Sequence, residues 1–144
     1  MNTMPDQELV ALLNTLLEAE RAGAKTLAAF LDDYPPASAA WQQLHKVQHD
    51  EAANCALLLT AVRSLGAEPS HATGDFLGKA LAQQGTVARL NFLNRGQGWV
   101  VRAIAAALPR LADGPVRRML ADMHASHLAN IDACNALLPP AARH

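Results

Sequence analysis

The sequence predicts an all-α protein, an antiparallel bundle of four long helices that forms one domain over residues 1–144. Hydrophobic residues make up 51% of the chain but aromatic residues only 4%. The apolar side chains are therefore mostly alanine and leucine, which favour helices and allow them to pack closely. Segments rich in proline and glycine separate four long stretches of helical pattern, and 144 residues are enough to bury one continuous core.

The four helical patterns begin and end at recognisable residues. The expected helices are residues 5–31, 37–65, 86–108 and 115–139. The first stops at the segment DDYPPAS, because consecutive prolines cannot continue a helix. Ser38 can cap the start of the second helix, and Gly66 follows its C-terminus. The third helix ends before Pro109, and Pro115 opens the fourth because proline is favoured in the first turn.

The connections indicate how the helices are arranged. The first and third connections are short, as between antiparallel neighbours. The middle one, GAEPSHATGDFLGKALAQQG, is about as long as a helix. A bundle whose second and third helices run parallel needs such a crossover to return along its whole length. A short helix is expected at residues 75–82, and Phe76, Leu77 and Leu81 favour a packed crossover over the alternative of a disordered linker.

Charge and composition exclude several classes of function. The net charge is −1 and no stripe of Lys and Arg is present, so a nucleic-acid partner is not expected. No apolar run reaches membrane-spanning length and the N-terminus MNTMPDQELV does not resemble a signal peptide, so a cytoplasmic protein without a membrane partner is expected. Cys55 and Cys134 fit a reducing compartment and are expected to be buried free thiols. A homodimer is expected because so alanine-rich a bundle often presents a second apolar face.

Polar residues interrupt the core-facing stripe of every predicted helix. Each stripe is located from apolar residues at helical spacing, since each residue advances about 100° around the axis. In the third helix the expected stripe is Leu90, Val101, Ala105 and Leu108. The polar residues and cysteines on or near the four stripes are Glu20; Gln48, Glu51 and Cys55; Asn94 and Gln97; and His127, Asn130 and Cys134. Because all four interruptions occur at a similar depth, they predict a shared site at mid-core.

The chemistry of this site follows from burial. A buried carboxylate is costly unless it is paired, hydrogen-bonded or bound to a metal. Glu20 and Glu51 facing each other would also repel, which raises the pKa of one or both carboxyl groups. A metal ion, a protonated His127 or shared protons would each offset this repulsion. Carboxylate and imidazole together are suitable ligands for Fe, Mn or Zn.

The segment LNTLLEAERAGA resembles the opening helix of the ferritin-like di-iron proteins, especially bacterioferritin, where the motif has the form LNxLLxxE. This resemblance to the superfamily, which includes rubrerythrin-like bundles, implies a ferritin-like fold and makes Glu20 a terminal metal ligand. In that superfamily the second and fourth helices each carry Glu-x-x-His, and the third a single bridging Glu. Glu51 matches the glutamate of the second helix, but Asn54 stands where its histidine belongs.

The third and fourth helices depart further from the ferritin-like pattern. Asn94, or alternatively Gln97, falls where the bridging glutamate belongs. In the fourth helix His127 stands in the Glu position and Asn130 in the His position. Neutral amides thus replace three of the six ligands, which favours one metal ion over a di-metal centre. The stretches TGDFLGKAL, LNRGQGWVVR and SHLANI are also similar to a small uncharacterised bacterial family of ferritin-like proteins.

Together these observations favour one transition metal, Fe or Mn, bound by Glu20, Glu51 and His127. A redox reaction is the expected chemistry if the protein is an enzyme, a question that the sequence leaves open. The residues expected around the ligands, where they would hold a water or add a weak ligand, are Asn54, Asn94, Gln97, Asn130 and Cys55. The alternative is a non-catalytic helical protein that binds a partner or a small ligand and whose metal-free core network only specifies packing.

The segment NRGQGW places Gly96 and Gly98 inside a predicted helix, where each costs about 1 kcal/mol relative to alanine. Close helix approach, a local bulge, or space for a ligand beside Gln97 and Trp99 would justify that cost. A break in the helix is the alternative interpretation.

Overall fold

The computed structural model describes residues 3–143, and within that range it contains helices but no strand, which confirms the all-α prediction. The five α-helices are α1 (Asp6–Phe30), α2 (Ala39–Ser64), α3 (Phe76–Leu81), α4 (Gly85–Ala107) and α5 (Pro115–Ala136). Short 3-10 turns occur at Leu31–Asp33, Leu108–Arg110 and Pro140–Ala142. None of the helices in the described range combines the length and the apolarity needed to cross a membrane.

Local sequence explains where the helices begin and end. Ser38 Oγ accepts a hydrogen bond from the Trp41 backbone N–H at 3.1 Å, which caps α2. Gly66 takes a left-handed conformation, with φ of 76°, just after α2. Pro115 occupies the first turn of α5, as expected. Helix α4 continues through the segment NRGQGW, so the interpretation of these glycines as a helix break is wrong.

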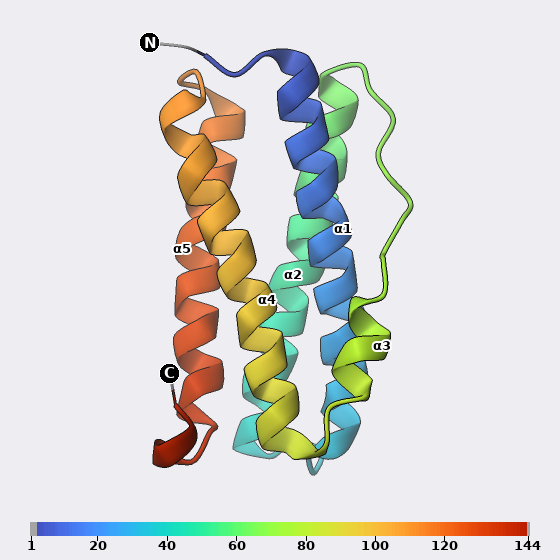
Figure 1. Ribbon diagram of the computed structural model, residues 1–144, viewed down its shortest axis with the longest axis vertical. Helices are drawn as coiled ribbons and strands as arrows, with labels where there is room; N and C mark the ends of the chain where they lie inside the picture. The colour runs from blue at the N-terminus through green and yellow to red at the C-terminus, as the bar shows by residue number, and fades with distance from the viewer. Residues whose placement is uncertain (1–2, 144) are drawn as a thin grey trace.

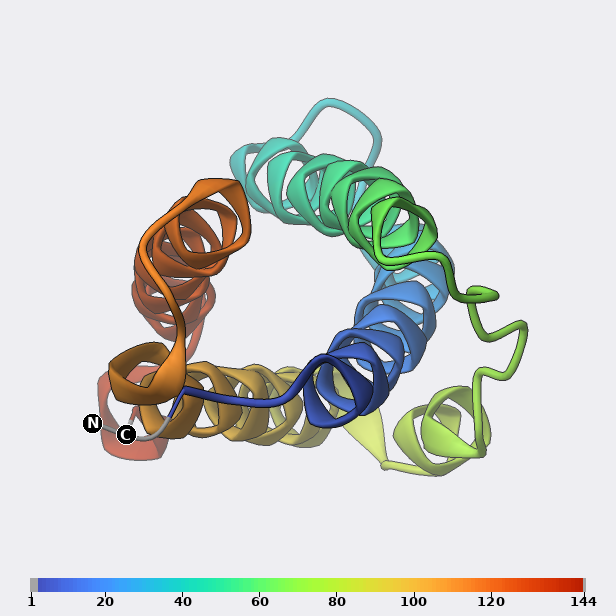
Figure 2. The ribbon, with the colours of Figure 1, turned by 90° about the horizontal axis from the view of Figure 1, so that it is seen from above.

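The four long helices lie side by side around a common axis, and α3 lies outside them next to α1 and α4 (Figure 1, Figure 2). Helices α1 and α2 form one closely packed pair, and α4 and α5 form the other. The crossover between α2 and α4 is fixed to α1, because Arg21 donates hydrogen bonds to the carbonyl oxygens of Ser70 and Ala72, each at 2.9 Å. Asn14 Oδ1 also accepts from the Ser70 backbone N–H at 2.7 Å. The crossover is therefore packed, and the disordered-linker alternative is wrong.

Buried apolar side chains form two clusters at opposite ends of the long helices. The first cluster contains Met4, Leu9, Leu13, Leu16, Leu17, Leu58, Ala61, Val62, Val100, Ile104, Ala107, Leu111, Leu120 and Met123. The second contains Leu27, Phe30, Leu44, Val47, Ala80, Leu90, Leu93, Cys134 and Leu138. Helices α1 and α5 run from the first cluster to the second, whereas α2 and α4 run the opposite way. Because α2 and α4 are parallel, the crossover between them must return along the length of the molecule.

A layer of buried polar side chains separates the two apolar clusters. Its members are Glu20 from α1, Glu51 and Asn54 from α2, Asn94 and Gln97 from α4, and His127 and Asn130 from α5. On each helix these residues lie between the residues of the two clusters, which places them at mid-height. All four long helices therefore contribute to one polar layer.

The buried face of α4 differs from the expected one. Val100 and Ile104 are buried, whereas Val101 is only partly buried and Ala105 is exposed. Every residue from 99 to 108 is apolar apart from Arg102, so the helical period alone could not select the buried face. Packing against the other helices decides the rotation of α4.

The two glycines inside α4 are expected to respond oppositely to substitution by alanine. A Cβ atom on Gly98 would meet only the end of the Arg102 side chain, at 3.2 Å, so Gly98→Ala should gain up to about 1 kcal/mol of stability. A Cβ atom on Gly96 would lie 2.9 Å from the ring of Phe76, which is itself packed on Phe92. Gly96→Ala should therefore cost about 1–3 kcal/mol. Urea unfolding of both variants measures the difference in stability. An equal gain of stability in both would show that the Phe76 ring leaves room for a Cβ atom at Gly96.

Candidate metal centre

Three ionisable side chains from three helices meet at the centre of the polar layer. Glu20 comes from α1, Glu51 from α2 and His127 from α5, and one carboxylate oxygen or ring nitrogen from each lies within 4.8 Å of the others. Their relative exposures are only 1%, 3% and 1%, so bulk water does not solvate them. These three residues, called here the Glu–Glu–His group, are the ones that the sequence singles out as metal ligands.

Contacts within the Glu–Glu–His group leave two carboxylate oxygens without a partner. His127 Nε2 contacts Glu20 Oε1, which also accepts a hydrogen bond from Asn54 Nδ2 at 3.2 Å. The second oxygen of Glu20 and Oε2 of Glu51 are buried and have no hydrogen-bond partner. Leaving a buried polar atom unpaired costs about 1–3 kcal/mol, and more for a charged group. A cation between the two carboxylates would remove this cost.

A chain of amides fixes the orientation of the His127 ring. His127 Nδ1 lies 3.4 Å from Gln97 Oε1, and Gln97 Nε2 donates to Asn94 Oδ1 at 3.0 Å. Asn94 Nδ2 in turn donates to Asn135 Oδ1 at 3.1 Å and to the carbonyl oxygen of Ile131 at 3.5 Å. Because a backbone carbonyl can only accept, this order makes Gln97 Oε1 an acceptor and His127 Nδ1 a donor. When a metal ion is bound, Nε2 would present its lone pair to that ion, as a metal ligand must.

Gly23 allows α1 to approach Glu51 closely. A Cβ atom at this position would lie 2.6 Å from Glu51 Oε2 and 2.8 Å from Oε1. A larger residue would therefore displace the carboxylate or separate α1 from α2. Sequence reasoning missed Gly23. The available signal was a glycine inside a long helix, three residues after Glu20 and so on the same face.

The environment of Glu51 favours the protonated carboxyl when no cation is bound. Burial raises the pKa of Glu51 well above its ordinary value of 4.5, and the negative charges of Glu20 and Asp50 raise this pKa further. A metal ion must therefore displace a proton from Glu51, and metal affinity is expected to increase with pH.

This pKa shift predicts how the stability of the metal-free protein depends on pH. Because the pKa of Glu51 is higher in the folded than in the unfolded chain, its contribution is full below the unfolded pKa and is lost as pH rises through the folded pKa. Glu51→Gln cannot ionise. The free energy of unfolding of the wild type minus that of Glu51→Gln should therefore fall as the pH rises above about 5. Urea unfolding of chelator-treated protein measures this, and a constant difference would be the contrary result.

Two other predicted neighbours, Asn130 and Cys55, make their contacts outside the Glu–Glu–His group. Asn130 Nδ2 donates to Asp50 Oδ2 at 3.3 Å, and its Oδ1 accepts from Lys46 Nζ at 3.2 Å, so its amide is bonded toward the α2 side of α5. Cys55 is partly buried and packs against the first apolar cluster. Burial raises the pKa of Cys55 to about 11 and that of Cys134 to about 12. Both thiols are therefore protonated at neutral pH.

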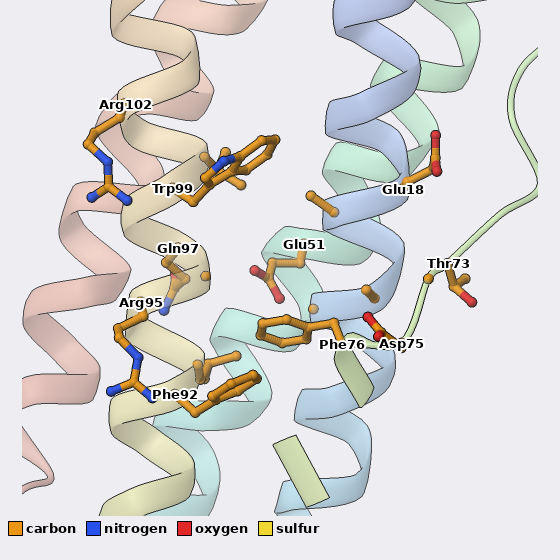
Figure 3. Close-up of a pocket in the computed structure, with 17 residues that line it drawn as sticks. Glu18, Glu51, Thr73, Asp75, Phe76, Phe92, Arg95, Gln97, Trp99 and Arg102 are labelled. Atoms are coloured by element: carbon orange, nitrogen blue, oxygen red, sulfur yellow. The ribbon is translucent and has the colours of Figure 1, made fainter. Parts of the chain in front are cut away.

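A cavity of about 490 Å³ opens beside the Glu–Glu–His group, between α1, α3 and α4 (Figure 3). Glu51 and Gln97 are its most buried polar lining residues, at 3% and 2% exposure, whereas Trp99 on its wall is 45% exposed. Gly96 and Phe76 also line it. The space beside Gln97 and Trp99 that the glycines of α4 suggest is therefore present, and it connects Glu51 with the surface.

The comparisons with known proteins concern the whole helical region. No curated protein matches the chain, and no solved structure does. The profile of a family described as a domain of unknown function, DUF6306, matches residues 7–136. This match extends from the first turn of α1 to the last residue of α5 and so includes Glu20, Glu51 and His127. The chain therefore belongs to the DUF6306 family.

Proposed function

We propose that the protein binds one divalent transition metal, Fe²⁺ or Mn²⁺, through Glu20, Glu51 and His127. The observation that carries this proposal is the pair of buried carboxylate oxygens without partners, beside a histidine whose ring is already oriented. Two carboxylates balance the charge of one divalent ion, and oxygen and imidazole ligands suit Fe and Mn. Gln97 Oε1 orients the His127 ring through its Nδ1 atom, and Asn54 Nδ2 donates a hydrogen bond to Glu20 Oε1. Gln97 and Asn54 are therefore positioning residues.

The surrounding residues favour one metal ion over two. A di-metal centre of the ferritin-like type uses a carboxylate from its third long helix, but α4 offers the amides Asn94 and Gln97 at this depth. Asp50 immediately precedes Glu51 on α2, but it is paired with Lys46, whose Nζ lies 2.9 Å from Asp50 Oδ2. The negative charge that a second divalent ion would need is therefore missing.

We also propose that the chain folds as one domain of the ferritin-like four-helix-bundle type. The parallel course of α2 and α4, the long crossover between them and a polar site at mid-core all support this assignment. A bound Fe or Mn ion would supply a Lewis-acid or redox centre. The protein would hold that ion between its helices, exclude bulk water from most sides and leave the side facing the cavity open.

A metal-free structural role is the second candidate. His127 already contacts Glu20, and Asn54 donates to the same oxygen, so part of the buried charge is compensated without a cation. In that case the polar layer would serve to specify the packing of the four helices. The protein would then bind a partner or a small ligand without catalysis.

Elemental analysis of protein purified without a His-tag separates the two candidates. We expect one Fe or Mn ion per chain, and protein treated with a chelator should take up one Mn²⁺ per chain again. Metal contents far below one ion per chain both before and after Mn²⁺ addition would favour the structural role.

A further inference from the structure

The cavity between α1, α3 and α4 has the size and walls of a site for a small organic molecule. Its volume of about 490 Å³ lies within the range of ligand pockets, roughly 300–1,000 Å³. Phe76 and Phe92 line one side with ring centroids 4.9 Å apart. Ala19, Ala22 and Gly23 of α1 line another side and, having small side chains, leave the space free. Aromatic rings facing small residues fit a flat, apolar body.

The inner end of the cavity is polar because Glu51 borders it. Glu51 Oε2 is buried and has no hydrogen-bond partner, and Figure 3 shows this carboxyl group directed into the space between α1 and α4. A hydroxyl group can donate to a carboxylate or accept from a protonated carboxyl, so it fits Glu51 in either state. Without a metal ion, an anionic group at this end would instead lie close to the buried negative charge of Glu20, which already opposes ionisation of Glu51.

The charges at the mouth of the cavity balance each other. Arg95 and Arg102 lie on the α4 side, whereas Glu18 and Asp75 lie on the side of α1 and α3 (Figure 3). With two positive and two negative side chains, the mouth does not select for a charged ligand of either sign. This balance, together with the apolar walls, is what an uncharged ligand requires.

We propose that this cavity binds a small uncharged molecule with a flat apolar body and one hydroxyl group, and that the hydroxyl group lies at Glu51. The proposal rests on the proposed function in one respect. Because Glu51 is also a ligand of the proposed metal, the hydroxyl end of the molecule is the end presented to that metal, as a substrate would be. The cavity itself does not require the metal and is tested without it.

Trp99 can report occupancy of the cavity. It lines the cavity, and the second of the two tryptophans, Trp41, lies at the start of α2 stacked on His45. In Trp41→Phe protein, Trp99 fluorescence is titrated with benzyl alcohol as the hydroxyl probe, toluene as the apolar probe and benzoate as the anionic probe. Chelator-treated protein and Mn²⁺-supplemented protein are titrated in parallel. In both forms we expect saturable binding of benzyl alcohol and toluene, and in the chelator-treated protein we expect binding of benzoate at least about tenfold weaker than that of benzyl alcohol.

Variants separate the contribution of Glu51 from that of the cavity walls. In chelator-treated protein, Glu51→Leu should weaken benzyl alcohol binding about tenfold and leave toluene binding unchanged. Ala19→Leu, which fills the α1 side, should weaken both probes, and Ala22→Val serves the same purpose if the first variant does not fold. Gly98→Ala, which lies outside the cavity lining, should change neither. Circular dichroism checks that each variant is folded.

The outcomes distinguish this proposal from the metal proposal. Absence of a saturable Trp99 response in the folded protein would overturn the cavity proposal, as would a Glu51→Leu variant that weakens both probes equally. If the probes bind as expected but the chain takes up no metal, the cavity site stands and the metal site fails. If the chain takes up metal but Trp99 does not respond to any probe, the metal site stands and the cavity site fails.

Discussion

Glu51→Gln is expected to weaken Mn²⁺ binding by at least about 100-fold, because loss of a group that merely orients a metal ligand already costs roughly 10–100-fold. The substitution keeps the shape of the side chain but removes one of the two carboxylates of the Glu–Glu–His group. Glu51 is only 3% exposed, and neither the neutral amide nor a water molecule from the cavity supplies the lost negative charge. Isothermal titration of chelator-treated protein with Mn²⁺ measures the affinity.

Glu18→Gln is the matched control for this prediction. Glu18 lies two residues before Glu20 on α1 and does not belong to the Glu–Glu–His group. The chemical change is the same as in Glu51→Gln, so the control corrects for the altered net charge. We expect the control to bind Mn²⁺ nearly as tightly as the wild type. Equal losses in the two variants would mean that Mn²⁺ binds elsewhere.

Gly23→Ala is expected to lower both stability and metal affinity. A Cβ atom on Gly23 would lie 2.6 Å from Glu51 Oε2, which is too close for either to remain in place. Overpacking of this kind costs about 1–3 kcal/mol. Because the displaced carboxylate no longer converges with Glu20 and His127, Mn²⁺ affinity should fall by at least about tenfold. Urea unfolding and Mn²⁺ titration measure the two effects.

Gly98→Ala serves as the control for Gly23→Ala, because both replace a glycine inside a long helix by alanine. Gly98 has open space around its Cα apart from the end of the Arg102 side chain. We expect Gly98→Ala to gain up to about 1 kcal/mol of stability and to keep the metal affinity of the wild type. If Gly23→Ala behaved like this control, the close contact between α1 and Glu51 would have no part in the site.

The helices and the depth of the polar layer were predictable because each leaves a strong local signal. Prolines stop α1 and open α5, Ser38 caps α2, and Gly66 takes the left-handed conformation that ends it. A glutamate among leucines at helical spacing, such as Glu20, has to find partners in the core. Four such interruptions at a similar depth therefore predict a common layer from the sequence alone.

Contacts that depend on how a helix is rotated about its axis, or on a glycine that lets two helices approach, were not predictable from one sequence. The C-terminal half of α4 is apolar on nearly all sides, so its buried face is chosen by packing. Asn130 lies close to His127 along α5, yet its amide bonds to Asp50 and Lys46. Gly23 has no side chain to mark its contact, and only the position of Glu51 against it reveals its role.

Anomalous scattering from a crystal soaked in Mn²⁺ tests the claim that Glu20, Glu51 and His127 hold one metal ion between them. We expect one peak per chain inside the polar layer, with a carboxylate oxygen of each glutamate and Nε2 of His127 about 2.0–2.3 Å away. Anomalous peaks confined to carboxylates on the surface, with none among these three side chains, would contradict the claim.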